Sequence, residues 1–242
     1  MKKRAQLLVC SLLLLILAAA FRRPSTINND VLAGAWEKRT DNVQEILLFA
    51  DGYVTHTVYD KSGRRFIRTR GGIFSTQGNK LSVQIEFDTK ETDAIGQTLS
   101  YGATVSQNTL TISAGGSEEK WTRLDPGNSG LAGLWKITAR KQEGGLVQIH
   151  QTGTRKTVKI LSGSRFQWAA IDPGTKQFMG TGGGTYTFQN GKYTEYIEFF
   201  SRDSSRVGSS LSFDGKLENG DWHHSGLSSR GDPIYEVWSR NK

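Results

Sequence analysis

The chain contains two copies of one sequence pattern. The stretch GGTYTFQNGKYTEYIEFF at residues 183–200 repeats GGIFSTQGNKLSVQIEFD at residues 71–88. A shift of 112 residues aligns the two stretches without a gap and places Glu86 on Glu198. Two repeats of about 100 residues are too few and too long for a solenoid, so we expect each repeat to be a small domain with its own core.

Turn-forming residues indicate the limits of the two domains. The segment DPGNSG at residues 125–130 has no apolar side chain and separates the repeats. We therefore predict a first domain over residues 31–124, a linker over 125–130 and a second domain over 131–241. Residues 21–30 are expected to form an N-terminal linker.

Residues 1–20 have the pattern of a secretory signal peptide. Three basic residues precede an apolar run that ends in small residues. The run is about 14 residues long, shorter than the roughly 20 that cross a bilayer as a helix. Cleavage after it removes the one cysteine, so the mature protein has no disulfide. We predict a secreted or periplasmic protein with no membrane span in the mature chain.

Alternation of apolar and polar residues predicts strands throughout both repeats. No segment after residue 20 keeps a helical period over three turns, and turn-forming pairs recur at short spacing. One of them, Asn190-Gly191, is typical of a two-residue hairpin turn. The pattern predicts an all-β fold, an antiparallel sandwich or barrel in each repeat.

Each repeat opens with Gly-x-Trp and closes with Trp-x-Arg. The motifs are Gly34-Ala35-Trp36 with Trp121-Thr122-Arg123, and Gly133-Leu134-Trp135 with Trp238-Ser239-Arg240. This pattern resembles the lipocalin, or calycin, signature, and the second repeat is also similar to lipocalin-like domains in secreted proteins of Bacteroidetes. The resemblance implies two small antiparallel up-and-down β-barrels in tandem, in which the opening Trp closes one end and the final Arg lies across it. A guanidinium stacked on an indole gains about 0.5–2 kcal/mol, so we interpret both Trp and Arg pairs as structural.

Strand alternation indicates which side chains point into each barrel. The inward face predicted in the first repeat is Leu81, Val83, Ile85 and Phe87. The corresponding face of the second repeat is Tyr193, Glu195, Ile197 and Phe199. The same alternation places these first-repeat residues inside: His56, Phe74, Leu99, Tyr101, Leu110 and Ile112. His56 is the ionisable candidate among them.

We predict a ligand-binding site inside the second barrel, which has the more aromatic interior. The predicted lining is Phe166, Trp168, Tyr186, Tyr193, Glu195, Phe213, Trp222 and His224. Apolar walls with a few polar groups are typical of small-molecule sites. Glu195 and His224 have three interpretations: structural groups bonded to each other or to tyrosines, polar groups that orient a ligand, or a general acid/base pair.

The sequence does not support several other functions. Basic residues are interleaved with acidic ones and do not form a nucleic-acid footprint. Residues 182–184 are three glycines, but the Lys and the helix of a phosphate-binding loop do not follow them. His223 and His224 face opposite sides of a strand, which disfavours a metal site. No Gly-x-Ser-x-Gly motif is present, which excludes an α/β-hydrolase in practice. We expect a binding module that is not an enzyme and has no cofactor.

The expected function is a secreted binding protein that holds a small apolar or aromatic ligand in the second barrel. The alternative is a protein-interaction or cell-envelope structural module with side-chain-filled barrels, no ligand and an envelope protein as partner. Tyr196 and Phe200 favour the alternative, since the first repeat has Gln84 and Asp88 there. Exposed aromatic residues mark contacts, so we predict that these two pack against the first domain or an adjoining segment, with an external partner as the alternative.

Overall fold

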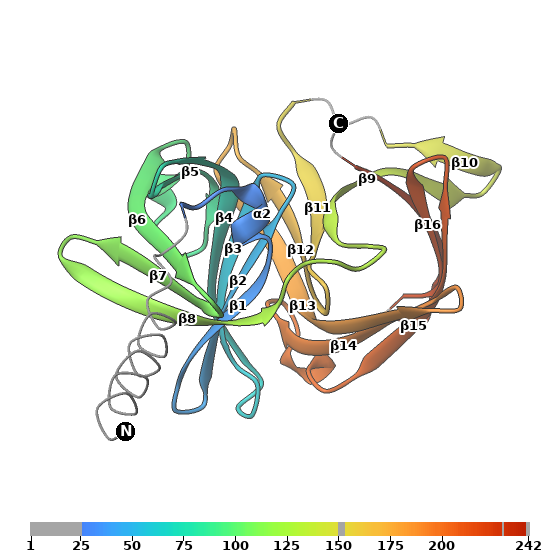
Figure 1. Ribbon diagram of the computed structural model, residues 1–242. Coiled ribbons are helices and arrows are strands. Elements are labelled where there is room, and N and C mark those ends of the chain that lie inside the picture. Colours follow the sequence, from blue (N-terminus) through green and yellow to red (C-terminus); the bar gives the residue numbers. More distant parts are fainter. Residues whose placement is uncertain (1–25, 150–152, 229, 241–242) are drawn as a thin grey trace, which may run out of the picture.

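The computed structural model describes residues 26–149, 153–228 and 230–240. The predicted signal peptide lies outside the described residues. Within them the chain forms two closed antiparallel barrels of eight strands each, side by side in Figure 1. The prediction of two small all-β barrels in tandem is confirmed. Among the described residues, none of the helices has the length and apolarity that a membrane span requires.

In the first barrel each strand pairs with the next, and β1 pairs with β8 to close the ring. Its strands are β1 (Gly34–Thr40), β2 (Val43–Ala50), β3 (Tyr53–Asp60), β4 (Arg65–Gln77), β5 (Lys80–Asp88), β6 (Thr98–Ser106), β7 (Thr109–Ala114) and β8 (Ser117–Asp125). A short helix, α2 (Asn29–Leu32), precedes β1, and a 3-10 turn, η1 (Thr92–Ala94), follows β5. Ile27 and Leu32 are buried in this barrel's core, so the packed domain begins before residue 31.

The second barrel repeats this order with one addition. Its strands are β9 (Gly133–Gln142), β10 (Gly145–Gln148), β11 (Lys156–Leu161), β12 (Arg165–Asp172), β13 (Gln177–Gln189), β14 (Lys192–Phe200), β15 (Ser210–Glu218), β16 (Asp221–Leu227) and β17 (Pro233–Arg240), with the 3-10 turn η2 (Ser204–Arg206) after β14. β9 pairs with β11 and β17 and closes the ring, while β10 extends β9 as an outer hairpin.

The predicted Trp and Arg pairs close one end of each barrel. The Arg123 guanidinium lies 3.9 Å from the ring centre of Trp36, and that of Arg240 lies 4.7 Å from the ring centre of Trp135. Each indole N–H donates to a backbone carbonyl four residues earlier at 2.8 Å. The predicted stacking of each Arg on its Trp is therefore confirmed.

A bulge at the same place in both repeats reverses the side-chain alternation. The β4–β5 register shifts between Gly71 and Gly72, and the β13–β14 register shifts at the equivalent glycines. One extra residue in a strand moves the following side chains to the other face of the sheet. Phe87 and Phe199 therefore lie between the barrels, and the prediction that they point inward is wrong.

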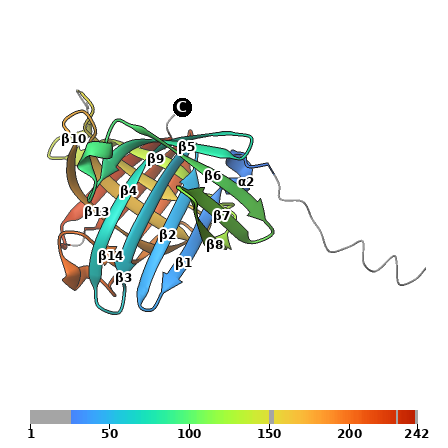
Figure 2. The ribbon, with the colours of Figure 1, turned by 90° about the vertical axis from the view of Figure 1, so that its left-hand side faces the viewer.

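The barrels share a buried apolar interface, which lies between them in Figure 1 and behind the first barrel in Figure 2. The Phe66 and Phe199 rings stack at 6.3 Å, and so do the Phe87 and Phe178 rings. The repeat shift of 112 residues exchanges these two pairs, so the interface has an approximate two-fold symmetry like that of a homodimer.

Polar groups at this interface are paired across it. The Gln167 side chain accepts from Thr57 at 2.8 Å and donates to Thr69 and Thr181 at 3.0 Å. Thr57 and Thr69 belong to the first barrel, whereas Gln167 and Thr181 belong to the second. All four side chains are buried. Satisfied buried polar groups fix one register between the two sheets.

Neither Tyr196 nor Phe200 belongs to the apolar cluster between the barrels. Tyr196 is 46% exposed on the outer face of the second barrel. Phe200 packs edge-on against Trp168, with ring centres 5.5 Å apart, beside the core of its own barrel. The prediction of packing within the chain is therefore wrong for Tyr196. Phe200 packs within its own barrel, because the bulge moves Phe199, and not Phe200, to the interface.

Candidate functional site

The structure brings the eight predicted site residues together inside the second barrel. All of them except Trp168 are buried, and Trp168 is half-buried against the same cluster. Alternation therefore placed these side chains correctly. Their packing decides whether space remains for a ligand.

Tyr193 lies at the centre of the second barrel. Its ring centre lies 4.8–6.4 Å from those of Phe166, Tyr186, Phe213, Trp222 and His224. These are contact distances for aromatic pairs, and interiors packed in this way leave few voids larger than a water molecule. The rings predicted to line a pocket fill this space themselves.

Lys159 is a site residue that the sequence reasoning missed. Its ammonium lies 2.8 Å from Glu195 Oε1, and both side chains are 6% exposed. The Tyr193 hydroxyl donates to the same oxygen at 2.9 Å. Lys159 also lies 5.0–5.9 Å from the centres of four rings, which surround its ammonium. Glu195 is therefore a paired structural group, and the alternation of β11 could have revealed its partner.

His224 does not form a pair with Glu195. No ion pair or hydrogen bond joins the two among the described residues, and His224 Nδ1 lies 3.7 Å from Glu236 Oε2, beyond hydrogen-bond distance. Burial lowers the pKa of His224 below its usual range, and the Lys159 charge acts in the same direction. His224 is neutral at pH 7, which fits a packed aromatic interior better than an acid/base pair.

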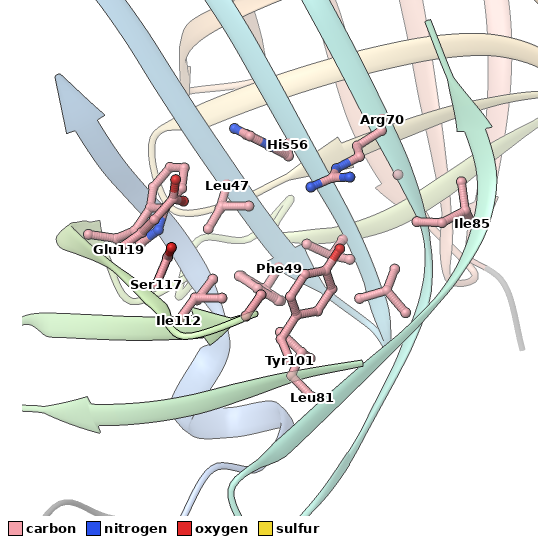
Figure 3. A pocket seen from close by; sticks show the side chains of 15 residues that line it. Leu47, Phe49, His56, Arg70, Leu81, Ile85, Tyr101, Ile112, Ser117 and Glu119 are labelled. Carbon is pink, nitrogen blue, oxygen red and sulfur yellow. The ribbon is translucent and has the colours of Figure 1, made fainter. Parts of the chain in front are cut away.

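The first barrel is hollow. A cavity of about 230 Å³ lies inside it. Figure 3 shows the side chains that line this cavity. Its apolar walls are Leu47, Phe49, Val54, Leu81, Val83, Ile85, Tyr101, Ile112, Ala114 and Trp121. Its polar groups are His56, Arg70, Ser117 and Glu119. Sites for drug-sized ligands measure roughly 300–1,000 Å³, so this cavity has room only for a smaller molecule.

Side-chain size explains why one barrel is hollow and the other is full. The larger counterparts in the second repeat are Phe166 for Val54, Trp168 for His56 and Tyr193 for Leu81. The two barrels have the same strand order and the same bulge. The aromatic rings of the second barrel thus occupy the volume that stays open in the first.

A charged cluster lies beside the cavity, away from the Trp36 end. Lys38 Nζ lies 3.0 Å from Glu45 Oε1 and 2.9 Å from Glu119 Oε1, and His56 Nε2 lies 2.8 Å from Glu45 Oε2. Burial raises the pKa of Glu45, but the hydrogen bonds from His56 and Lys38 outweigh it and hold the pKa at about 2. Glu45 is thus ionised at pH 7 and can only accept hydrogen bonds.

His56 contributes a neutral imidazole to the cavity wall. Burial lowers the pKa of His56, and the charges of nearby arginines lower it further. Glu45 raises this pKa, but by less. A neutral ring beside an ionised carboxylate donates from Nε2, which leaves Nδ1 as an acceptor. The prediction that His56 points into the first barrel is confirmed. Among the described residues, no group of three or more His, Cys, Asp or Glu side chains could hold a metal ion.

Comparisons with known proteins add no assignment. No family model matches the chain, and no curated protein matches it. One solved structure with a likeness is a DnaN sliding clamp (DNA polymerase III subunit beta) from Pseudomonas aeruginosa bound to griselimycin. It is 9% identical, over 93% of this chain and 80% of that chain, with a TM-score of 0.14. A likeness at this TM-score carries no argument about fold or function.

Proposed function

We propose that the protein binds a small, mainly apolar organic molecule inside the first barrel. The observation that carries the proposal is the cavity of about 230 Å³ with apolar walls. The proposal keeps the function predicted from the sequence and moves the site from the second barrel to the first. A secreted or periplasmic location remains part of it and is supported by the signal pattern at residues 1–20.

The walls of the cavity supply the binding energy. Removal of apolar surface from water stabilises a complex by roughly 25 cal/mol per Å². One end of the barrel is closed by Trp36 under Arg123. The polar residues lie on the other side of the cavity. In the β1–β2 register Trp36 pairs with Leu47, and the charged pair Lys38 and Glu45 follows two residues further from the closed end. A ligand therefore lies with its apolar part toward Trp36.

The lipocalin-like relationship also remains a proposal. It is supported by the up-and-down order of eight strands in each barrel and by the Trp and Arg contact at one end of each. In this proposal the second barrel is a filled partner that supports the first barrel through their shared interface.

The experiment is a fluorescence titration with N-phenyl-1-naphthylamine, a neutral apolar probe. Val54→Phe and Leu81→Tyr introduce the rings that the second repeat has at these positions. Each should weaken binding by at least about tenfold, since each ring takes volume from the cavity. Gln84→Tyr is the matched control, because it introduces the ring of the equivalent Tyr196 on the exposed face of the same strand.

The titration has two clear outcomes. Saturable binding that both cavity variants lose and Gln84→Tyr keeps would support the proposal. Absence of saturable binding by the intact protein, or unchanged affinity in both cavity variants, would refute it. Circular dichroism of each variant verifies that the barrels remain folded.

An interaction module is the second candidate function. The observation that favours it is the exposure of large apolar side chains on the second barrel. These are Leu146, Val147, Tyr196, Leu217 and Leu227. Exposed groups of this kind mark contact surfaces, and an envelope protein remains the proposed partner. Substitution of Tyr196 and Leu227 by Ser tests this candidate. The variant should no longer bind the envelope protein, and its affinity for N-phenyl-1-naphthylamine should be unchanged.

A further inference from the structure

We propose that the ligand is an amphipathic organic anion whose acidic group is bound by Arg70. This inference rests on the proposed function and names the chemical class of molecule that the first barrel takes. An apolar body would occupy the cavity, and a carboxylate, sulfonate or phosphate group would meet the guanidinium.

Arg70 has the position that this role requires. It lies on β4, directly opposite His56 on β3, and it lines the cavity. In Figure 3 its guanidinium points from the strand into the space between His56 and Tyr101. Leu47, Phe49 and Leu81 line the apolar part of the same cavity. The cation therefore stands where an apolar volume meets the polar cluster.

Arg70 is also the charge that this cluster leaves without a direct partner. Lys38 is engaged by Glu45 and Glu119, at 3.0 and 2.9 Å. His56 is engaged by Glu45 at 2.8 Å. Among the described residues, no hydrogen bond or ion pair involves the Arg70 side chain, which is half-buried. Buried or partly buried charges are normally paired, so an unpaired guanidinium at a cavity indicates an anion site.

The neighbouring carboxylate on β5 does not fill this role. Asp88 is paired with Arg70 in the β4–β5 register. Its Oδ1 instead accepts from the backbone N–H groups of Lys90 and Glu91, at 2.8 and 2.9 Å. Asp88 thus stabilises the turn after β5, and these two hydrogen bonds direct its carboxylate to that turn and not to Arg70.

The chemistry of the guanidinium also favours an anion. Lys38 lies between Glu45 and Glu119, and His56 is neutral, so Arg70 is the cavity cation that these carboxylates do not engage. A guanidinium also presents parallel N–H donors that match the two oxygens of a carboxylate or the oxygens of a sulfonate or phosphate.

The second repeat supports a functional origin for Arg70. Its equivalent there is Gly182, where a side chain would collide with the rings of Phe200 and Trp168. The bulge and the Trp and Arg lid occur in both repeats, whereas this arginine occurs only where the barrel is hollow. The barrel architecture itself therefore does not require a cation at this position.

The test is displacement of N-phenyl-1-naphthylamine by decanoate and by 1-decanol, which differ in the acidic group. Arg70→Met should weaken decanoate binding by about tenfold or more, the effect of one lost charge-assisted contact, and leave decanol and the probe within about twofold. Arg65→Met is the matched control, because it removes an exposed arginine from the same strand. Decyl sulfate and decyl phosphate then identify which acidic group is preferred.

The outcomes distinguish the proposed anion site at Arg70 from the proposed apolar binding in the first barrel. Unchanged decanoate affinity in Arg70→Met, or an equal loss for decanoate and decanol, would overturn the anion site and leave apolar binding intact. Absence of probe binding by the intact protein would instead refute the proposed function. Should Arg70→Met not fold, Arg70→Gln provides the same comparison, because it also removes the charge and keeps a polar side chain.

Discussion

Lys159 and Glu195 form an ion pair of 2.8 Å inside the second barrel, at the positions where the first barrel has Leu47 and Val83. This pair is one of the differences between the interiors of two barrels with the same strand order. Two charges in an apolar interior cost desolvation energy, which their mutual attraction and extra hydrogen bonds offset. The second barrel is therefore specialised for a fixed interior, and the first for an open one.

Removal of one member of this pair should destabilise the protein strongly. Lys159→Met leaves Glu195 buried without its cation, and we expect a loss of about 3–5 kcal/mol in the free energy of unfolding. Urea denaturation followed by tryptophan fluorescence measures it. The double variant Lys159→Leu with Glu195→Val, which copies the first repeat, should recover most of this loss.

A surface pair provides the control for that experiment. Lys192 and Asp214 form an ion pair of 2.6 Å, but both side chains are largely exposed. Lys192→Met should change stability by less than about 1 kcal/mol. A similar small effect for Lys159→Met would contradict a structural role for the buried pair.

Glu198 should make the contact between the barrels sensitive to acid. It accepts from Tyr59 at 2.7 Å, from Lys61 at 2.7 Å and from Arg165 at 2.8 Å. Burial raises its pKa, but the Arg165 charge and these hydrogen bonds outweigh burial and hold the pKa below the ordinary 4.5. A carboxyl of this kind contributes its full stability above about pH 4.5 and loses it as pH falls through the folded pKa.

Glu198→Gln should therefore lower the melting temperature at pH 7 and reduce its dependence on pH below 4.5. Thermal denaturation between neutral and acid pH measures both effects. Glu118→Gln, at an exposed position on β8, should leave the profile unchanged. Parallel profiles for Glu198→Gln and the intact protein would show that this carboxylate does not link the barrels.

The bulge glycines should tolerate no side chain. A Cβ at Gly72 would overlap the backbone carbonyl of Gln84, and one at Gly184 would overlap that of Tyr196. Since backbone atoms must move, Gly72→Ala should cost at least about 2 kcal/mol. Gly130→Ala is the control, because its Cβ meets nothing within 4 Å. Equal stability of the two variants would contradict the proposed need for glycine at the bulge.

Much of the fold could be predicted from the sequence because the repeat supplies two independent copies of each signal. The Gly-x-Trp and Trp-x-Arg motifs placed the closed end of each barrel, and alternation placed Leu81, Val83 and Ile85 inside. Alternation failed at Phe87 and Phe199 because a bulge adds one residue before them. The position of a bulge could not be predicted from the paired glycines alone.

The location of the cavity could not be predicted from the type of residue inside each barrel. Aromatic side chains were expected to line a pocket in the second barrel, but in a ring of fixed size they fill it. Val54 and Leu81 leave the space that Phe166 and Tyr193 occupy. Comparison of side-chain volumes at matched positions would have indicated the first repeat.

The measurement that tests the central claim most directly is methyl NMR of the protein during titration with N-phenyl-1-naphthylamine. Methyl signals report binding residue by residue and distinguish the two interiors. The hollow-barrel account predicts saturable shifts at Val54, Val83 and Ile112, which line the cavity, and none at Ile137 and Ile197 in the second core. Shifts confined to Ile137 and Ile197, or no shifts in either barrel, would contradict it.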